Sequence, residues 1–264
     1  MSSILTRDTG ETSLPTVVCL HSLFLNATFF DALVAAGRGR FRFLCPTFPG
    51  QDDRLQEVDR EVTMDDCVAD LERTLARAGV ERFALVGQSM GGDVAVRVAA
   101  RHPSRVSALV LAGSSARAEP PEQLAAFRAV CDRIAQVGFD AQLQQTVLEI
   151  MLGASTRADP TKREVVARFE AQIASLDARL SHAVRGVIER ADATPLLAQI
   201  KAPTLIINGL EDMPRPPAWS AEMARHIPGA EHRPLNGIGH SPTQEAPELV
   251  LPLILGFLAR HATT

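Results

Sequence analysis

A Gly-x-Ser-x-Gly turn between an apolar run and a helical pattern is the feature that most constrains this chain. The apolar run at residues 83–86 leads into Gly87-Gln88-Ser89-Met90-Gly91, and helical spacing follows over 93–100. A sharp strand-to-helix turn needs small residues on both sides of the serine, and the two glycines supply them. The serine then lies at a helix N-terminus, where free backbone N–H groups favour a developing oxyanion. This context predicts a nucleophilic serine at Ser89.

Two acids and a histidine late in the chain are candidate partners for this serine. A serine hydroxyl is a weak nucleophile near neutral pH, so it needs a base, and the base needs an orienting carboxylate. Glu211 and Asp212 follow a strand-like run at 204–208, and His240 lies in a glycine-rich loop. The order serine, acid, histidine is the one expected for a nucleophile elbow. Both partners should lie at the carboxyl edge of a parallel sheet.

The rest of the pattern predicts an α/β fold with a mostly parallel, twisted sheet and helices on both faces. Short apolar runs typical of buried strands alternate with helical patterns. These runs lie at 16–20, 41–45, 106–112 and 204–208. The capping-box sequence that begins at Thr63 predicts a helix ending near Ala78.

Residues 116–195 carry a different pattern, in which helical spacing dominates and strand-like runs are missing. We expect four helices here, inserted after a core strand and forming a lid over the site. The alternative, that these helices extend the core, stays open. The predicted divisions are 1–115 and 196–264 as two parts of one core, with 116–195 as the lid.

The chain resembles the α/β-hydrolase fold enzymes nearly end to end. The segments that carry the resemblance are 20–23, 87–92, 209–212 and 239–242, the last followed by Glu245. The resemblance implies a cofactor-independent serine hydrolase. It also implies that the outermost hairpin of the fold is truncated here, because only one strand fits before Thr16.

The resemblance selects Asp212 over Glu211 as the acid of a triad with Ser89 and His240. Some α/β hydrolases carry their acid after the strand that follows the elbow, and this chain has Glu119 there. Glu119 therefore stays open as an alternative acid.

An oxyanion hole needs two backbone donors. Met90, directly after the serine, supplies one N–H group. The resemblance places the second at Leu23, on the loop after the early strand. Ser22 replaces the glycine that usually follows the histidine there, and the Ser-Leu pair is similar to enol-lactonases. The segment 48–54 departs from the enol-lactonase pattern, so a close match to those enzymes is disfavoured.

Two residues are candidates for the substrate pocket. Phe24 follows the predicted oxyanion loop, and His182 lies in the predicted lid. Either Arg54 or an arginine of the lid could bind a substrate carboxylate, and the sequence selects none of them.

Composition excludes several other classes. The formal net charge is −4 without a basic block, so nucleic acid is not an expected partner, and no apolar run is long enough to span a membrane. Cys19 and His21 share a face of a strand but have no third ligand nearby in sequence, so we expect no metal. Scattered cysteines and the lack of a signal peptide favour free thiols and a cytoplasmic location. A homodimer is left open.

The hypothesis from sequence is hydrolysis of a small, largely apolar carboxylic ester or lactone through an acyl-enzyme on Ser89. Carbon–carbon bond hydrolysis, perhydrolysis and acyl transfer would use the same triad. A small-molecule receptor of this fold can also retain the triad without turning a ligand over. The sequence does not separate these alternatives.

Overall fold

The computed structural model describes residues 6–263, which form one seven-stranded sheet in the order β1-β3-β2-β4-β5-β6-β7. The strands are β1 (Thr6–Asp8), β2 (Thr16–Leu20), β3 (Arg42–Pro46), β4 (Phe83–Gln88), β5 (Val106–Ala112), β6 (Thr204–Gly209) and β7 (Glu231–Leu235). All neighbours pair in parallel except β1, which is antiparallel to β3. The mostly parallel sheet predicted from the sequence is confirmed.

The five central strands are apolar because both of their faces are covered. Every residue of β2 to β6 is buried, which is typical of parallel sheets with helices on both sides. The edge strand β7 is half-exposed and contains Pro234, which only an edge strand tolerates well. The sequence pattern did not predict β7, because Glu231–Leu235 has no apolar run.

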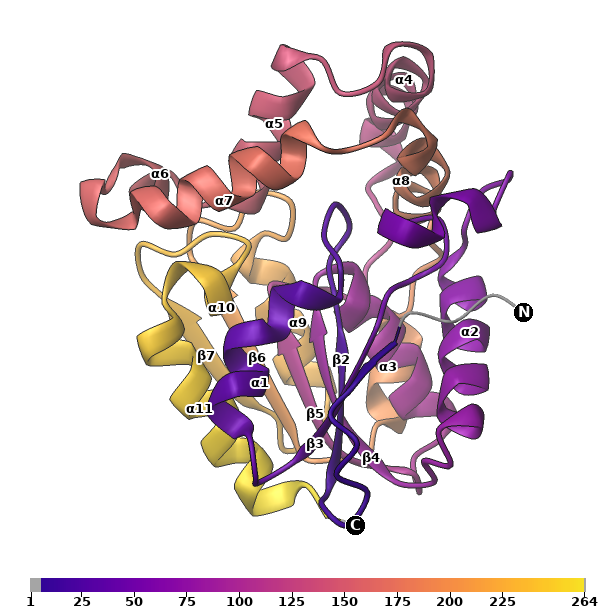
Figure 1. Ribbon diagram of the computed structural model, residues 1–264, viewed down its shortest axis with the longest axis vertical. Coiled ribbons are helices and arrows are strands. Elements are labelled where there is room, and N and C mark those ends of the chain that lie inside the picture. Colours follow the sequence, from indigo (N-terminus) through magenta and orange to yellow (C-terminus); the bar gives the residue numbers. More distant parts are fainter. Residues whose placement is uncertain (1–5, 264) are drawn as a thin grey trace.

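Helices cover the two faces of the sheet (Figure 1). One face carries α2 (Met64–Arg77), α3 (Met90–Arg101) and α9 (Pro217–His226). The other carries α1 (Asp31–Gly37) and α11 (Pro247–His261), which pack against each other. The shorter elements of the core are η1 (Ala27–Phe30), η2 (Asp52–Glu57), η5 (Thr194–Gln199) and α10 (Pro242–Glu245). The capping box before α2 is present, since Thr63 and Asp66 exchange side chain-to-backbone hydrogen bonds.

A helical insertion lies between β5 and β6, above the carboxyl ends of the strands (Figure 1). It contains α4 (Pro121–Val137), α5 (Ala141–Met151), α6 (Ala154–Ala158), η3 (Pro160–Lys162), α7 (Arg163–Ala174), η4 (Ala178–Leu180) and α8 (Ser181–Ile188). The sequence predicted four helices and missed the short α6. The two ends of the insertion meet, because the Ala193 N–H donates to the Ala116 carbonyl at 2.7 Å. The assignment of 116–195 as a separate lid stays a prediction.

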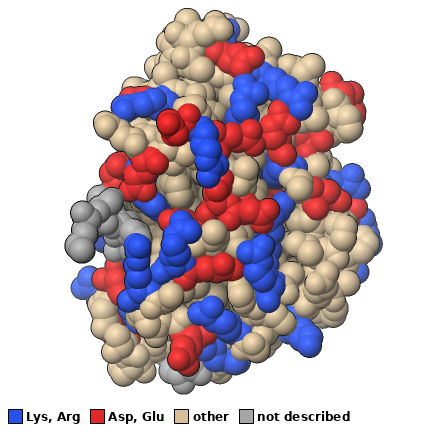
Figure 2. All heavy atoms as spheres, turned by 90° about the vertical axis from the view of Figure 1, so that its right-hand side faces the viewer, with Lys and Arg blue, Asp and Glu red and all other residues tan. Residues whose placement is uncertain are grey.

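The segment before Thr16 contains the short edge strand β1, and residues 1–5 lie outside the described part of the chain. No helix within residues 6–263 is long and apolar enough to cross a membrane. The four cysteines are buried and free, as the sequence predicted. Figure 2 shows acidic and basic side chains interleaved on the face that carries α2. Many charged side chains of the protein are paired, among them Arg60 with Asp66 and Arg128 with Glu189.

The start of α3 packs so closely on the end of β2 that only glycine fits. A Cβ atom on Gly91 would lie 2.0 Å from the Leu20 carbonyl oxygen, and one on Gly87 would lie 2.6 Å from the Gly91 oxygen. Real Cβ contacts essentially never come this close, and backbone atoms cannot give way as a flexible side chain can. This approach fixes the turn that carries Ser89 against the loop that follows β2.

We predict that Gly91→Ala lowers the free energy of unfolding by at least about 2 kcal/mol, because a new methyl group would overlap backbone. Gly256→Ala is the matched control, since a Cβ on Gly256 in α11 would meet nothing within 4 Å. That control should be neutral or gain about 0.5–1 kcal/mol from helix propensity. Denaturant unfolding of both variants measures the difference. Equal stability of the two would show that the close approach is not a constraint.

The insertion should exchange amide hydrogens faster than the core, because it is attached through loops rather than through sheet hydrogen bonds. In α4, only Cys131 and Ile134 are buried. Hydrogen exchange should therefore be faster over 116–195 than over 82–87 and 106–112. A covalent inhibitor on Ser89 should slow exchange in the insertion, because it fills the cavity beneath it. Uniform protection unaffected by inhibitor would place these helices in the static core.

Candidate active site

Ser89 occupies a strained turn between β4 and α3. Its backbone has φ 52° and ψ −114°, a conformation that residues other than glycine rarely adopt. Two hydrogen bonds hold it there: the Ser89 N–H donates to the Ala112 carbonyl at 3.0 Å, and the Ser114 hydroxyl donates to the Ser89 carbonyl at 2.9 Å. Helix α3 begins directly after it. Strain of this kind persists where the surrounding structure over-determines it, often at functional sites. The tight strand-to-helix turn predicted at Ser89 is present, and the role of Ser89 as the nucleophile stays a prediction.

His240 and Asp212 meet at the carboxyl edge of the sheet. The His240 Nδ1 lies 3.0 Å from both carboxylate oxygens of Asp212, and both residues are buried. The Arg215 backbone N–H donates to Asp212 Oδ1 at 2.9 Å, which fixes the carboxylate. With Nδ1 donating to Asp212, the Nε2 atom is the acceptor, as a general base requires. The structure thus brings together two of the three predicted triad residues, and Ser89 and His240 line the same cavity.

The other two acids contact other partners, although Glu119 lines the same cavity. Glu211 accepts hydrogen bonds from the Ser155 N–H at 2.8 Å and from the Ser155 hydroxyl, and these bonds lower the pKa of its carboxyl. Glu119 accepts from Arg190 at 2.6 Å and from Arg215 at 3.0 Å. Of the three acids that the sequence left in question, Asp212 is the one in contact with His240.

Glu245 organises the loop that carries His240, a role that the sequence analysis missed. Its buried carboxylate accepts backbone hydrogen bonds from Gly239 at 3.0 Å, from Ser241 at 2.9 Å and from Gly153 of the insertion at 2.9 Å. The first two donors flank the histidine, so the carboxylate sets the path of the chain on both sides of it. The only sequence signal was a glutamate five residues after His240, noted as part of the family pattern.

The loop after β2 carries the predicted oxyanion donor Leu23. His21 fixes this loop, because its Nδ1–H donates to the Ser22 carbonyl at 2.8 Å while its Nε2 accepts from the Phe48 N–H at 3.1 Å. Burial lowers the pKa of His21 to about 4, so the ring is neutral at pH 7. Both ring nitrogens are occupied within the protein. Phe24 follows with φ 69°, a second strained residue at the cavity.

Leu23 lines the cavity and Met90 opens α3, and their roles as oxyanion donors stay a prediction. Among residues 6–263, His, Cys, Asp and Glu side chains do not gather in any group of three that could hold a metal ion.

The cavity above Ser89 has a volume of about 550 Å³, within the range of small-molecule sites. Its floor is Ser22, Leu23, Phe24, Ser89 and His240, and most of its remaining wall comes from the insertion. The apolar lining residues of the insertion are Phe127, Val130, Ile134, Leu143, Val147, Ile150, Met151, Val184, Val187 and Ile188. The pocket role predicted for Phe24 agrees with its place here.

His182 does not line this cavity, so its predicted place in the pocket is wrong. Helix α8 presents Val184, Val187 and Ile188 to the cavity, and these positions share one helical face. His182 lies off that face, half-buried, where its carbonyl accepts from the Val62 N–H at 3.2 Å.

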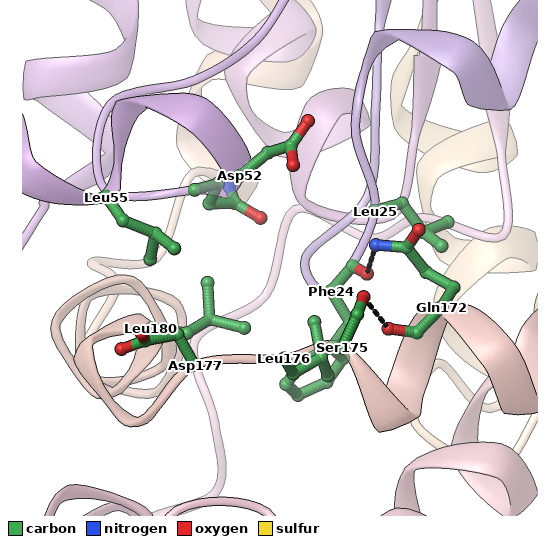
Figure 3. A pocket seen from close by; sticks show the side chains of 10 residues that line it. Phe24, Leu25, Asp52, Leu55, Gln172, Ser175, Leu176, Asp177 and Leu180 are labelled. Carbon is green, nitrogen blue, oxygen red and sulfur yellow. Dashed lines mark hydrogen bonds between the residues drawn. The ribbon is translucent and has the colours of Figure 1, made fainter.

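A second, smaller hollow of about 50 Å³ lies on the far side of Phe24, between the core and the insertion (Figure 3). Leu55 of η2 and Leu180 of η4 point toward each other across it. The Gln172 side chain donates to the Phe24 carbonyl at 3.4 Å. Phe24 lines both hollows and therefore forms part of the wall between them.

Comparison with known proteins agrees with this geometry. Residues 15–247 match the family model described as alpha/beta hydrolase fold. The chain belongs to the α/β-hydrolase fold family. A thermophilic esterase from Thermogutta terrifontis, solved with malate bound, is 28% identical, with a TM-score of 0.88 over 98% of this chain and 93% of that one. The enol-lactonase from Burkholderia xenovorans LB400 is 25% identical, with a TM-score of 0.86 over 96% and 95%.

A curated relative, polyketide synthase ThaQ of Burkholderia thailandensis, is 28% identical over 256 residues. The match covers 92% of this chain but only 12% of that much longer protein. It therefore relates this chain to one part of ThaQ.

Asp212→Asn should lower kcat by about 10³-fold or more, because the carboxylate must hold the His240 tautomer and stabilise the imidazolium. Glu211→Gln should retain most of the activity, since Glu211 faces Ser155 rather than His240. Steady-state kinetics on a p-nitrophenyl ester compares the two. An active Asp212→Asn together with an inactive Glu119→Gln would move the acid to Glu119.

Glu245→Gln should cost about 1–3 kcal/mol of stability, because an amide cannot accept all the backbone N–H groups that the carboxylate now accepts. It should also lower kcat, since the flanks of His240 lose their anchor. The exposed Glu248, three residues further on, is the matched control, and Glu248→Gln should change neither quantity. Denaturant unfolding and ester hydrolysis report both effects. Wild-type stability and kcat in Glu245→Gln would remove Glu245 from this role.

Proposed function

We propose that this protein is a serine hydrolase that cleaves a small, largely apolar carboxylic ester or lactone through an acyl-enzyme on Ser89. The observation that carries the proposal is the convergence of a strained Ser89 and an Asp212-bound His240 on one apolar cavity. A hydroxyl at a helix N-terminus and an oriented imidazole are the parts that acyl transfer needs.

The reaction follows from the positions of these groups. Ser89 Oγ attacks the substrate carbonyl while His240 Nε2 takes its proton, and Asp212 stabilises the resulting imidazolium. Backbone N–H groups of Leu23 and Met90 bind the oxyanion of the tetrahedral intermediate. His240 then gives the proton to the leaving alkoxide. A water molecule, deprotonated by His240, hydrolyses the acyl-enzyme and returns the serine.

The cavity supports the substrate class. Its apolar wall suits an alkyl or aryl group, and its volume suits a small molecule rather than a polymer. The two structural neighbours named above, an esterase and an enol-lactonase, hydrolyse bonds of this kind. Both cover more than nine-tenths of this chain, including the insertion.

Ser89→Ala should lower kcat by about 10³-fold or more without loss of folding, because the triad acts as a unit. A fluorophosphonate should label Ser89 in the wild type, and peptide mass mapping identifies the site. Ser104→Ala, an exposed serine, is the control and should label as the wild type does.

Labelling at another serine would overturn the assignment of the nucleophile. A panel of esters, lactones and diketones tests the substrate class with the same two variants. Turnover of diketones alone would favour carbon–carbon bond hydrolysis. Tight binding without turnover of any member would favour a receptor.

A further inference from the structure

The wall of the cavity contains one arginine, Arg215, which lies beside apolar residues and beside Glu119, its carboxylate partner. Its neighbours in the lining include Met213, Pro214, Pro216 and Trp219, and its guanidinium lies 6.0 Å from the centre of the Trp219 ring. Arg215 is 5% exposed, so a cation has been taken almost completely out of water. Burial of a charge is costly unless partners compensate it.

The partners of Arg215 occupy only part of its hydrogen-bonding capacity. Its Nη1 donates to Glu119 Oε1 at 3.0 Å and to the Pro214 carbonyl at 2.8 Å. Within residues 6–263, its Nε and Nη2 donate to no protein atom, and neither is among the fully buried atoms without a partner. These two nitrogens therefore reach accessible space, and the cavity is the space that Arg215 lines.

Arg215 belongs to a cluster of buried charges behind this wall. Arg215 and Arg190 share Glu119, and Arg190 and Arg97 pair with Asp93 on α3. Asp212 also attracts Arg215, so three arginines face three carboxylates. Glu119 contacts two arginines, so its charge is shared between them.

Arg215 keeps its charge in this cluster. Burial, followed by repulsion from Arg190, lowers the pKa of Arg215 to about 10. The side chain is therefore protonated at pH 7. An anion placed against Nε and Nη2 would compensate both the burial and the repulsion.

Arg54, the arginine considered from the sequence, does not compete for this role. It is buried away from the cavity, where it donates to Asp70 at 2.6 Å and to the Thr47 carbonyl at 2.7 Å, and it also pairs with Glu57. Its partners meet its hydrogen-bonding needs, and it holds η2 to α2.

We propose that Arg215 binds a carboxylate of the substrate, so the natural substrate is an ester or lactone with an apolar body and a free carboxylate remote from the scissile bond. A planar guanidinium with two free N–H groups on adjacent nitrogens matches a carboxylate in a bidentate pair. That the bound molecule is a substrate rests on the proposed hydrolase function. Binding of its carboxylate by Arg215 does not depend on that function.

Matched ester pairs test the proposal by hydrolysis. Monomethyl esters of dicarboxylic acids carry the carboxylate on the acyl side, and O-acetyl hydroxy acids carry it on the alcohol side. The neutral partners are the corresponding compounds with a methylated carboxylate. In the wild type, kcat/KM should favour the charged member of at least one pair by about ten-fold or more, as one charge-assisted hydrogen bond allows. Arg215→Gln should abolish that preference.

Arg117→Gln is the matched control, because Arg117 also pairs with a glutamate but lies half-exposed at the surface. It should keep the wild-type preference. Hydrolysis of every pair at the same charged-to-neutral ratio in wild type and Arg215→Gln would overturn the carboxylate assignment and leave the hydrolase proposal standing.

A binding measurement separates the two proposals. Calorimetric titration of Ser89→Ala with the charged esters measures affinity without turnover, and Arg215→Gln in the same background should weaken it by about ten-fold or more. If no ester is hydrolysed by the wild type but this loss of affinity is seen, the hydrolase proposal fails and the carboxylate site stands. Equal affinity of Ser89→Ala with and without Arg215→Gln overturns the carboxylate site.

Arg215→Lys decides the matter if Arg215→Gln does not fold, because lysine keeps the positive charge but cannot form a bidentate pair with a carboxylate. In the Ser89→Ala background it should weaken binding of the charged esters and leave binding of their neutral partners unchanged. Equal weakening of charged and neutral esters, or no weakening, counts against the proposal.

Discussion

The geometry of the whole site depends on how closely the first turn of α3 approaches the end of β2. A backbone contact this short is available only to glycine, and it sets Ser89 beside the loop that carries Leu23. The strain at Ser89 is maintained by hydrogen bonds to β5 and to Ser114. Ser89 is thus positioned by main-chain packing of buried elements, while most of the cavity wall above it comes from the helices of the insertion.

Buried carboxylates fix the other half of the site. Asp212 accepts one backbone N–H group and Glu245 accepts three, so both carboxylates restrain the chain around His240. A carboxylate that accepts several N–H groups compensates its own burial and stiffens the loop around it. His240 is therefore held at its ring by Asp212 and at its flanking backbone amides by Glu245.

The sequence was sufficient for the features that follow from local patterns. Apolar runs predicted the buried strands, the Thr63 capping box predicted α2, and the glycines around Ser89 predicted the elbow. The sequence did not predict features that depend on tertiary neighbours. The strand β7 is polar because it lies at the sheet edge, and His182 was misplaced because helical spacing alone does not say which face of α8 meets the cavity. Nothing in the sequence pointed to Arg215, because its environment is set by Glu119 and Arg190, which are distant in sequence.

The carboxylate of Glu245 has one further consequence, because its third donor, Gly153, belongs to the insertion. If the insertion moves away from the core, Glu245 loses an N–H group that its burial requires, and the loop around His240 loses part of its anchor. The two displacements share one free-energy cost, so they are thermodynamically coupled in both directions. A position of the insertion close to the core and an ordered histidine loop would therefore favour each other.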